Sequence, residues 1–271
     1  MKVLGIGDNV VDKYVHIKTM YPGGNALNFS VFAKKLGAEA AFVGVFGDDR
    51  EAEHVEKTVR ELGIDISRCR HYHGENGCAR VTLEDGDRVF LGSNEGGVTR
   101  LNPLKLDDED RAYIRSFDIM HTGLYSHTGH ILPELRTLGV PISFDFSDDF
   151  EEEQVDRFIP YADFAFFSCS HMSDEATMEY IRSKWQREGQ LIAATRGSDR
   201  SMIYDGHQYY FHVPELVEAV DTMGAGDSYI TAFLLSYLKD RGIQKAMEEG
   251  STFAAQSCLV EGSFGFGVVY E

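Results

Sequence analysis

From Asp221 to Ser228 the sequence reads DTMGAGDS. It leaves an apolar, β-branched segment, passes through two glycines, and enters a long apolar helical segment, Ala225–Leu238. Such a junction leaves several backbone N–H groups free at the start of a helix, where the helix dipole favours a negative group. Gly224 and Gly226 would let the backbone come close to that group. A phosphate or a phosphoryl group would fit this turn.

Asp227 lies in the first turn of the predicted helix. Beside a bound phosphoryl group, its carboxylate could accept the proton of an attacking hydroxyl. Alternatively, Asp227 is only a helix residue stabilised by the dipole, and Gly224 and Gly226 form only a tight turn. The residues of this stretch leave both interpretations open.

A second motif, PGGNALN, occupies residues 22–28. Gly23 and Gly24 give a backbone that a ligand can approach, and Asn25 and Asn28 share one face of a predicted helix. The rest of that helix is apolar, so an inward Asn28 would need a hydrogen-bond partner such as a ligand hydroxyl. In the alternative interpretation, Asn25 caps the helix and Asn28 faces solvent.

Short apolar runs alternate with longer segments of helical spacing, which predicts an α/β fold with a central, mostly parallel sheet and helices on both faces. The runs are Lys2–Ile6, Ala40–Val45, Asp118–His121, Ile142–Phe146, Phe164–Phe167 and Leu191–Thr195. Asp8 and Asp12 follow the first run, where the strand ends of such sheets gather ligands. The long segment Gln244–Val260 is predicted to be helical.

Two other regions predict smaller β-structures. Val10–Lys18 and Cys78–Leu91 have the pattern of antiparallel strands outside the main sheet, the second folded at Asp85-Gly86. A further hairpin is predicted at Asp205-Gly206, between residues 201–204 and 208–211.

Composition excludes several classes of partner. The chain has 26 Lys and Arg against 44 Asp and Glu, a formal charge of -18, which disfavours nucleic acid and anionic membranes. The four cysteines have no paired spacing, and no apolar run approaches the roughly 18 residues of a membrane span. We expect a cytoplasmic protein with no nucleic-acid or membrane partner.

The two motifs together resemble the signatures of the PfkB, or ribokinase-like, carbohydrate kinases. The resemblance implies one ribokinase-like domain over residues 1–271, with a small β-sheet lid from about 10–22 and 71–98. It also implies transfer of the γ-phosphoryl group of ATP to a primary hydroxyl of a sugar. Asp227 would be the general base, and the Gly224, Ala225 and Gly226 amides would form an anion hole.

Further site residues follow from the same resemblance. It implies that Asp12, Gly24, Asn25 and Asn28 bind the sugar. It also implies that Thr195, Gly197 and Ser198 bind the nucleotide together with Gly226, with the adenine near Ala254–Cys258. Arg196 is either a phosphate contact or a surface residue. No P-loop motif occurs in the sequence.

The resemblance also bears on the metal ions and on the assembly of the protein. Many PfkB kinases carry an Asn-x-x-Glu element linked to magnesium, but this chain has Ser168–His171 at that position. Magnesium is still expected with the ATP phosphates, while its protein ligands stay unknown. A monovalent cation near Asp221 and the Gly262–Gly267 backbone is a further possibility. Lids of this family often pair between subunits, which implies a homodimer.

Several short runs most resemble the fructoselysine 6-kinase branch of the family, which implies a fructosamine acceptor. They are residues 7–12, 23–28, 87–90 and 144–148. Another ketose or riboside kinase and a non-catalytic sensor remain alternatives. A nicotinamide-dependent oxidoreductase is disfavoured, because Val10 stands where the dinucleotide motif needs a third glycine. The pairs His71 with His73 and His127 with His130 lack a third metal ligand at a usual spacing.

Overall fold

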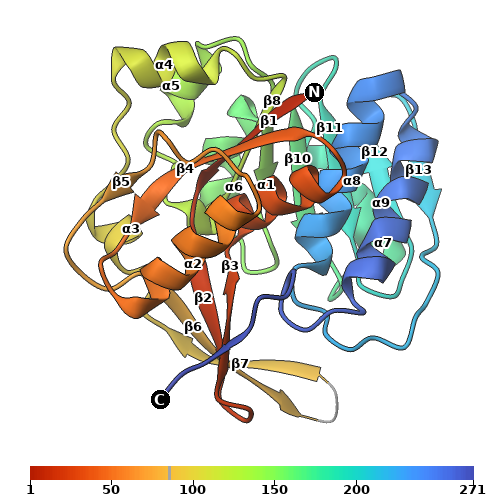
Figure 1. Ribbon diagram of the computed structural model, residues 1–271. Coiled ribbons are helices and arrows are strands. Elements are labelled where there is room, and N and C mark those ends of the chain that lie inside the picture. Colours follow the sequence, from red (N-terminus) through yellow and green to blue (C-terminus); the bar gives the residue numbers. More distant parts are fainter. Residues whose placement is uncertain (85–86) are drawn as a thin grey trace.

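The computed structural model describes residues 1–84 and 87–271, and its main sheet has nine strands (Figure 1). Their order is β13-β12-β11-β10-β9-β8-β1-β4-β5. The strands are β1 (Lys2–Gly7), β4 (Glu39–Phe46), β5 (Arg70–His71), β8 (Ile119–Gly123), β9 (Ile142–Asp145), β10 (Phe164–Ser168), β11 (Leu191–Thr195), β12 (Ser201–Tyr204) and β13 (Tyr209–His212). All strands from β11 to β5 run parallel, which confirms the predicted α/β fold. Strand β12 pairs antiparallel with β11, and β13 pairs antiparallel with β12. The parallel strands therefore bring their carboxyl ends to one edge.

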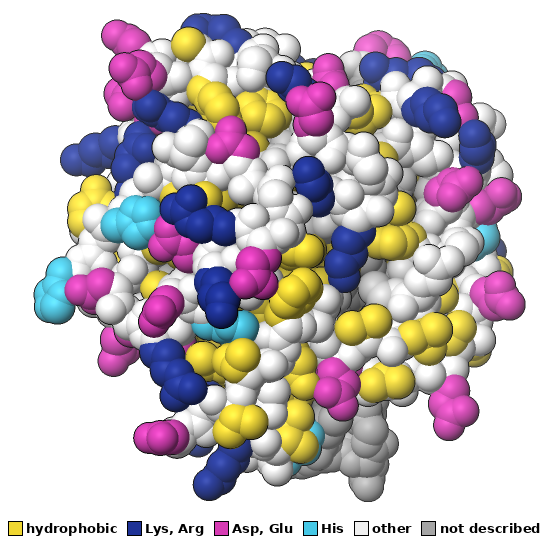
Figure 2. Space-filling view, viewed as in Figure 1, with side chains coloured by type: hydrophobic (Ala, Val, Ile, Leu, Met, Phe, Trp, Pro, Cys, Tyr) yellow, Lys and Arg dark blue, Asp and Glu magenta, His cyan; other side chains and the backbone are white. Residues whose placement is uncertain are grey.

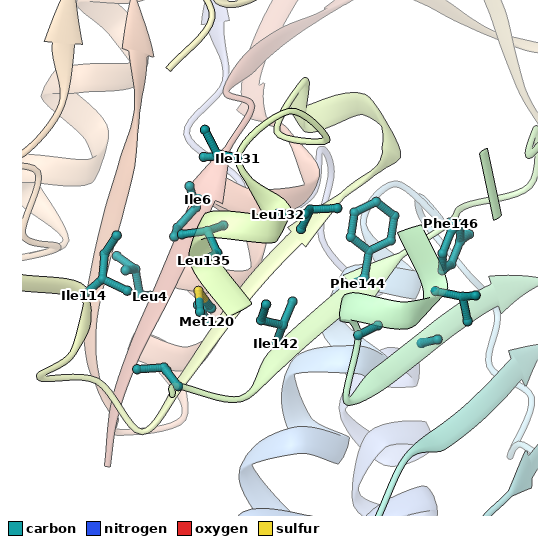
Figure 3. Close-up of a cluster of buried hydrophobic side chains, with 14 of the residues drawn as sticks. Leu4, Ile6, Ile114, Met120, Ile131, Leu132, Leu135, Ile142, Phe144 and Phe146 are labelled. Atoms are coloured by element: carbon teal, nitrogen blue, oxygen red, sulfur yellow. The ribbon is translucent and has the colours of Figure 1, made fainter. Parts of the chain in front are cut away.

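Helices cover both faces of this sheet, because the side chains of the buried strands alternate between two apolar layers. On β1, Val3 packs toward one layer of helices, α1 (Asn25–Lys35), α8 (Ala225–Asp240) and α9 (Ile243–Ser257). Leu4 and Ile6 pack toward the other layer, α4 (Asp108–Ile114), α5 (Leu132–Arg136), α6 (Glu152–Phe158) and α7 (Asp174–Lys184). Figure 3 shows the second layer, in which side chains from β1, β8 and β9 meet Leu132 and Leu135. The helices are α1 (Asn25–Lys35), α2 (Arg50–Glu61), α3 (Val98–Leu101), α4 (Asp108–Ile114), α5 (Leu132–Arg136), α6 (Glu152–Phe158), α7 (Asp174–Lys184), α8 (Ala225–Asp240) and α9 (Ile243–Ser257), with short 3-10 turns at η1 (Leu124–Ser126) and η2 (Ile159–Tyr161). Within the described ranges, none of these helices has the length and apolar character that a membrane crossing requires.

A second, smaller sheet lies below the first in Figure 1. Its order is β14-β3-β2-β6-β7, and its strands are β2 (Val10–Tyr14), β3 (Thr19–Gly23), β6 (Gly77–Glu84), β7 (Asp87–Ser93) and β14 (Val268–Val269). The sequence predicted antiparallel strands in Val10–Lys18 and Cys78–Leu91, which is correct for β6 with β7, and β2 also pairs antiparallel with β3, a strand that was not predicted. The pairing of β2 with β6 is parallel, so that part of the prediction was wrong. The predicted turn at Asp85-Gly86 lies outside the described residues.

Other local predictions had mixed outcomes. The hairpin at Asp205-Gly206 is confirmed by the antiparallel pairing of β12 with β13. Helix α9 ends at Ser257, three residues before the predicted end, where the amides of Leu259 and Val260 turn back to bond Gln256 and Ser257. Residues 213–220, before Asp221, run as mostly exposed irregular chain beyond β13.

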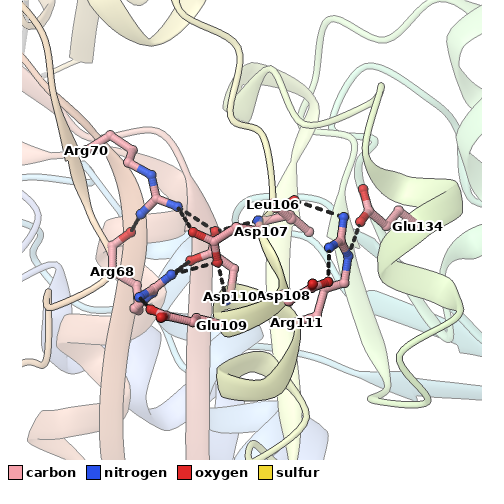
Figure 4. A network of polar contacts seen from close by, with 9 residues as sticks. All are labelled: Arg68, Arg70, Leu106, Asp107, Asp108, Glu109, Asp110, Arg111 and Glu134. Atoms are coloured by element: carbon pink, nitrogen blue, oxygen red, sulfur yellow. Dashed lines mark hydrogen bonds and ion pairs between the residues drawn. The ribbon is translucent and has the colours of Figure 1, made fainter.

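An ionic network joins α4 to the chain around β5, at the edge of the main sheet opposite to β13 (Figure 4). The buried carboxylate of Asp110 accepts hydrogen bonds from Arg68 at 2.8 Å and Arg70 at 2.5 Å. Asp107 caps α4 and also pairs with Arg68. This network stabilises the edge farthest from β13 and takes no part in the site described next.

Candidate active site

The turn at the start of α8 has the open geometry that its two glycines predict. Gly224 caps the helix in the left-handed region (φ 74°), and a Cβ on it would come within 2.9 Å of Ser263 Cβ. A Cβ on Gly226 would meet no atom within 4 Å, so the backbone borders open space there. The Ala225 amide donates to the Thr222 carbonyl at 3.2 Å, so in this arrangement it is engaged by the protein itself. The turn therefore offers the Gly224 and Gly226 amides most directly to an anion.

Asp221 holds this turn in place through both of its carboxylate oxygens. Oδ1 accepts the Met223 amide at 2.9 Å, and Oδ2 accepts the Gly262 amide at 2.9 Å and the hydroxyl of Tyr14. The carboxylate thus joins the turn to the C-terminal loop and to β2. Three protein donors therefore face these oxygens, which leaves about one lone pair of the carboxylate for a further partner.

The start of α1 is positioned by Asp8, which follows β1. Its carboxylate accepts the backbone amides of Asn25 at 2.7 Å and Ala26 at 3.2 Å. Gly24 precedes the helix with φ 112°, and a Cβ there would lie 2.9 Å from the Asp8 carbonyl oxygen. Asp8 therefore serves as the cap of α1, and the alternative in which Asn25 caps the helix was wrong.

The side chains of Asn25 and Asn28 converge on Asp227. Asn28 Nδ2 donates to Asp227 Oδ2 at 2.6 Å, and Asn25 Nδ2 donates to Asp227 Oδ1 at 2.7 Å. Asn28 is 3% exposed, which excludes the solvent-facing alternative. Its Oδ1 is buried and has no hydrogen-bond partner in the described part of the chain. The two signature motifs, about 200 residues apart, thus form one cluster.

Asp12 lies at the edge of the same cluster. It is buried on β2, and a Cβ on Gly23 would come within 2.7 Å of Asp12 Oδ2 and 3.6 Å of Ser263 Oγ. Ser263 Oγ in turn accepts a hydrogen bond from Asn28 Nδ2 at 3.2 Å. Around Gly23 therefore lie Asp12, Asn28 and Ser263, beside Asp227, the predicted general base.

Two further residues of the cluster were not predicted as site residues from the sequence. Asp145 ends β9, and its Oδ2 accepts Asn25 Nδ2 at 2.9 Å. Burial, with the negative charge of Asp227 next in size, raises the pKa of Asp145 to about 7. His121, on β8, is fully buried, and this burial lowers its pKa to about 3. Both residues lie at or near the carboxyl ends of parallel strands, where ligands bind, and this position was the signal from which the sequence could have predicted them.

The predicted nucleotide residues lie at the same edge of the sheet, two strands beyond β9. Thr195 ends β11, and Gly197 (φ 61°) and Ser198 follow it in a turn. Arg196 is buried, where it binds Asp174 and the Met172 carbonyl, so the surface alternative was wrong. The segment Ala254–Cys258 ends α9 beside α8, and the Cys258 carbonyl accepts the Val220 amide at 2.8 Å.

No metal site is evident from protein ligands. Across residues 1–84 and 87–271, no group of three or more His, Cys, Asp and Glu side chains is arranged to hold an ion. The predicted histidine pairs bind separate partners: His71 contacts Glu56, His73 contacts Asp48, and His127 and His130 contact the carbonyls of Glu95 and Leu104. After β10, Cys169 is buried and His171 is exposed.

Comparison with known proteins decides the family, since the sequence pattern of the pfkB family carbohydrate kinases matches residues 3–265. The chain belongs to the PfkB family. It is therefore an ATP-dependent sugar kinase, a phosphotransferase with a sugar hydroxyl as acceptor. The match covers almost the whole chain, including both signature motifs.

Individual relatives of this PfkB kinase support the same assignment. It is 40% identical to the fructosamine kinase FrlD of Bacillus subtilis over 273 residues, which cover 100% of this chain and 95% of the relative. It is 33% identical to the fructoselysine 6-kinase of Shigella flexneri, with 97% and 100% covered. A solved ribokinase II from E. coli, in complex with ATP and magnesium, shares the fold with a TM-score of 0.78 at 18% identity, with 97% and 94% covered.

Proposed function

We propose that this kinase transfers the γ-phosphoryl group of ATP to the primary hydroxyl of a fructosamine, and that fructoselysine is converted to fructoselysine 6-phosphate. Asp227 is the general base, and the Gly224–Gly226 turn is the anion hole. One observation carries the mechanism: Asp227 lies in the first turn of α8, directly after the open glycine turn, and the amides of Asn25 and Asn28 hold both of its oxygens.

In the proposed reaction, the sugar hydroxyl attacks the γ-phosphorus in line while Asp227 accepts its proton. Negative charge that develops on the phosphoryl oxygens is stabilised by the Gly224 and Gly226 amides and by the dipole of α8. Loss of one such donor raises the barrier by about 3–4 kcal/mol. Magnesium, when bound with ATP, would neutralise phosphate charge mainly through water and phosphate ligands, and we assign it no protein ligand.

The acidic rim of the cluster supports a fructosamine as the acceptor. A fructosamine carries a substituted amine, which is cationic near neutral pH. Asp148 and Asp149 follow Asp145 and are exposed, and among the described residues no ion pair involves any of these three. Their charges also raise the pKa of the neighbouring Tyr125 after the larger effect of burial. An ammonium group next to the sugar would meet this unpaired negative charge.

For ATP, we propose phosphate contacts from Thr195, Gly197, Ser198 and Gly226, with the adenine against Ala254–Cys258. The exposed segment before α8 supports this position. Leu216 is 70% and Val220 50% exposed, and hydrophobic side chains gather at the lower right of Figure 2, the region where Figure 1 draws this segment. A flat, apolar base would cover such side chains.

We also propose a homodimer in which the smaller sheets of two copies pair. Strand β7 is an edge of this sheet, and its Phe90 is 58% exposed. An edge strand with exposed apolar side chains favours pairing with another chain. Cys69, Cys78 and Cys169 are free thiols, which agrees with the reducing cytoplasm that we propose for this enzyme. Analytical ultracentrifugation of the wild type and Phe90→Lys tests the dimer, which should dissociate in the variant.

The acceptor is tested by ADP release with fructoselysine, fructose, ribose and a riboside under identical conditions. We expect the highest kcat/KM with fructoselysine. The double variant Asp148→Asn/Asp149→Asn should lower kcat/KM for fructoselysine by up to about tenfold and leave fructose unaffected. Glu153→Gln on α6 is the matched control. Equal kcat/KM for fructoselysine and fructose would refute the fructosamine assignment, a preference for ribose or the riboside would favour the alternative acceptors, and acceptor binding without ADP release would favour a sensor.

A further inference from the structure

The buried His121 contacts the catalytic cluster indirectly, through Asn25. Its Nε2 lies 3.1 Å from Asn25 Oδ1, and its Nδ1 lies 2.9 Å from Ser143 Oγ on the neighbouring strand β9. Its ring also stacks on Phe29, with ring centroids 4.7 Å apart. His121 and Ser143 are register partners in the parallel pairing of β8 with β9. The imidazole is thus fixed on three sides.

The contacts determine which nitrogen of His121 carries the proton. Burial keeps the ring neutral, since its pKa is lowered to about 3, so only one nitrogen holds hydrogen. Asn25 Oδ1 can only accept, so the hydrogen is on Nε2. Nδ1 then accepts the hydroxyl proton of Ser143. The chain Ser143–His121–Asn25 therefore has a single consistent direction of hydrogen-bond donation.

The side chains of Asp145 and Asp227 favour the same orientation of the Asn25 amide. With Oδ1 bound to His121, Nδ2 must face the carboxylates, and its two hydrogens go to Asp145 Oδ2 at 2.9 Å and Asp227 Oδ1 at 2.7 Å. A flipped amide would place Oδ1 against two carboxylates and Nδ2 against the N–H of His121. All hydrogen-bonding groups of the Asn25 side chain are consequently used within the protein.

We propose that His121 is a positioning residue for the proton acceptor Asp227, and that it acts by locking the Asn25 amide that bridges Asp145 and Asp227. This inference rests on the proposed role of Asp227. Asn25 then orients the base as part of the same relay, whereas the buried Oδ1 of Asn28 has no hydrogen-bond partner among the described residues and can accept one from the sugar. A base held at the wrong angle accepts the hydroxyl proton poorly even when both substrates are bound.

Two His121 variants and a spectrum test the proposal. His121→Leu removes the N–H and should lower kcat by about 10- to 100-fold with little change in KM for ATP. His121→Gln can place an amide N–H near the position of Nε2 and should keep most of the wild-type kcat. In wild-type protein labelled with ¹⁵N-histidine, the signal lost in His121→Gln should report a neutral ring protonated at Nε2 throughout pH 5–9.

The outcomes separate this inference from the proposed function. If Asp227→Asn is inactive while His121→Leu and His121→Gln have equal kcat, the base assignment stands and the positioning role of His121 is refuted. A ring that is protonated at Nδ1, or that becomes charged within pH 5–9, also refutes it, whatever the enzyme activity. If Asp227→Asn keeps normal turnover, the proposed function itself fails.

Discussion

Replacement of Asp145 by asparagine should change how the stability of the enzyme depends on pH. In the folded protein the pKa of Asp145 is raised from 3.8 to about 7 by burial and by the charge of Asp227. Between these two values the unfolded chain has released the proton while the folded chain still holds it. The folded state therefore binds more protons, and the free energy of unfolding falls as pH rises from about 4 to 7. The variant has no such proton.

The difference between 3.8 and about 7 corresponds to about 4 kcal/mol at 1.36 kcal/mol per pKa unit. Roughly a third of this stabilising free energy is already lost at pH 5. The Asp145 side chain is only half-buried, and its contact with solvent reduces the remaining free energy. From pH 5 to pH 8, the stability of Asp145→Asn relative to wild type should thus rise by about 2 kcal/mol. Urea unfolding at pH 5, 6, 7 and 8 measures this difference, with the exposed neighbour variant Asp148→Asn as control. A difference that does not grow with pH, or that grows equally for the control, would refute the reasoning.

The remaining predictions concern the turn before α8. Gly224→Ala forces alanine into the left-handed region and should lower the free energy of unfolding, measured in urea, by about 1–2 kcal/mol. Gly226→Ala should leave this stability intact but lower kcat, because its methyl group enters the open space beside the turn. Equal stability of the two variants would contradict this prediction. Tyr14→Phe removes the hydroxyl that binds Asp221 and should lower the free energy of unfolding by about 1.5–3 kcal/mol and raise KM for the acceptor more than KM for ATP. An unchanged Tyr14→Phe enzyme would show that this link between β2 and the turn is dispensable.

Much of the fold was predictable, because its parallel strands are short apolar runs that the burial of both faces requires. The main-sheet strands β1, β4, β8, β9, β10 and β11 all lie within the predicted segments or extend them slightly. Strands β3 and β14 were not predicted. Strand β3 contains Pro22 and Gly23, which indicate a turn, and β14 has only two residues, so its pairing depends on tertiary contacts. The parallel pairing of β2 with β6 also depends on such contacts.

The site was predictable only in part. Asp227, Asn25 and Asn28 stand out because two glycine motifs surround them. His121 and Asp145 were missed as site residues because they belong to apolar strand segments, where a lone His or Asp has no distinctive spacing. Asp8 was ambiguous in the sequence, and only the position of α1 reveals that its carboxylate caps that helix. Predicting contacts such as His121 with Asn25 requires the register of β8, β1 and α1, which sequence periodicity does not contain.

In the proposed mechanism Asp227 accepts the proton of the acceptor hydroxyl, and turnover of Asp227→Asn is the decisive measurement. The asparagine is similar in size and keeps the side chain in the first turn of α8. Its amide nitrogen replaces one of the two oxygens that accept from Asn25 and Asn28, so we expect some loss of stability without loss of the fold. With fructoselysine and ATP at saturation, we predict that kcat falls at least about 10²-fold in a variant that still unfolds cooperatively in urea. Turnover within a few-fold of wild type, in a variant that is equally well folded, would contradict the account.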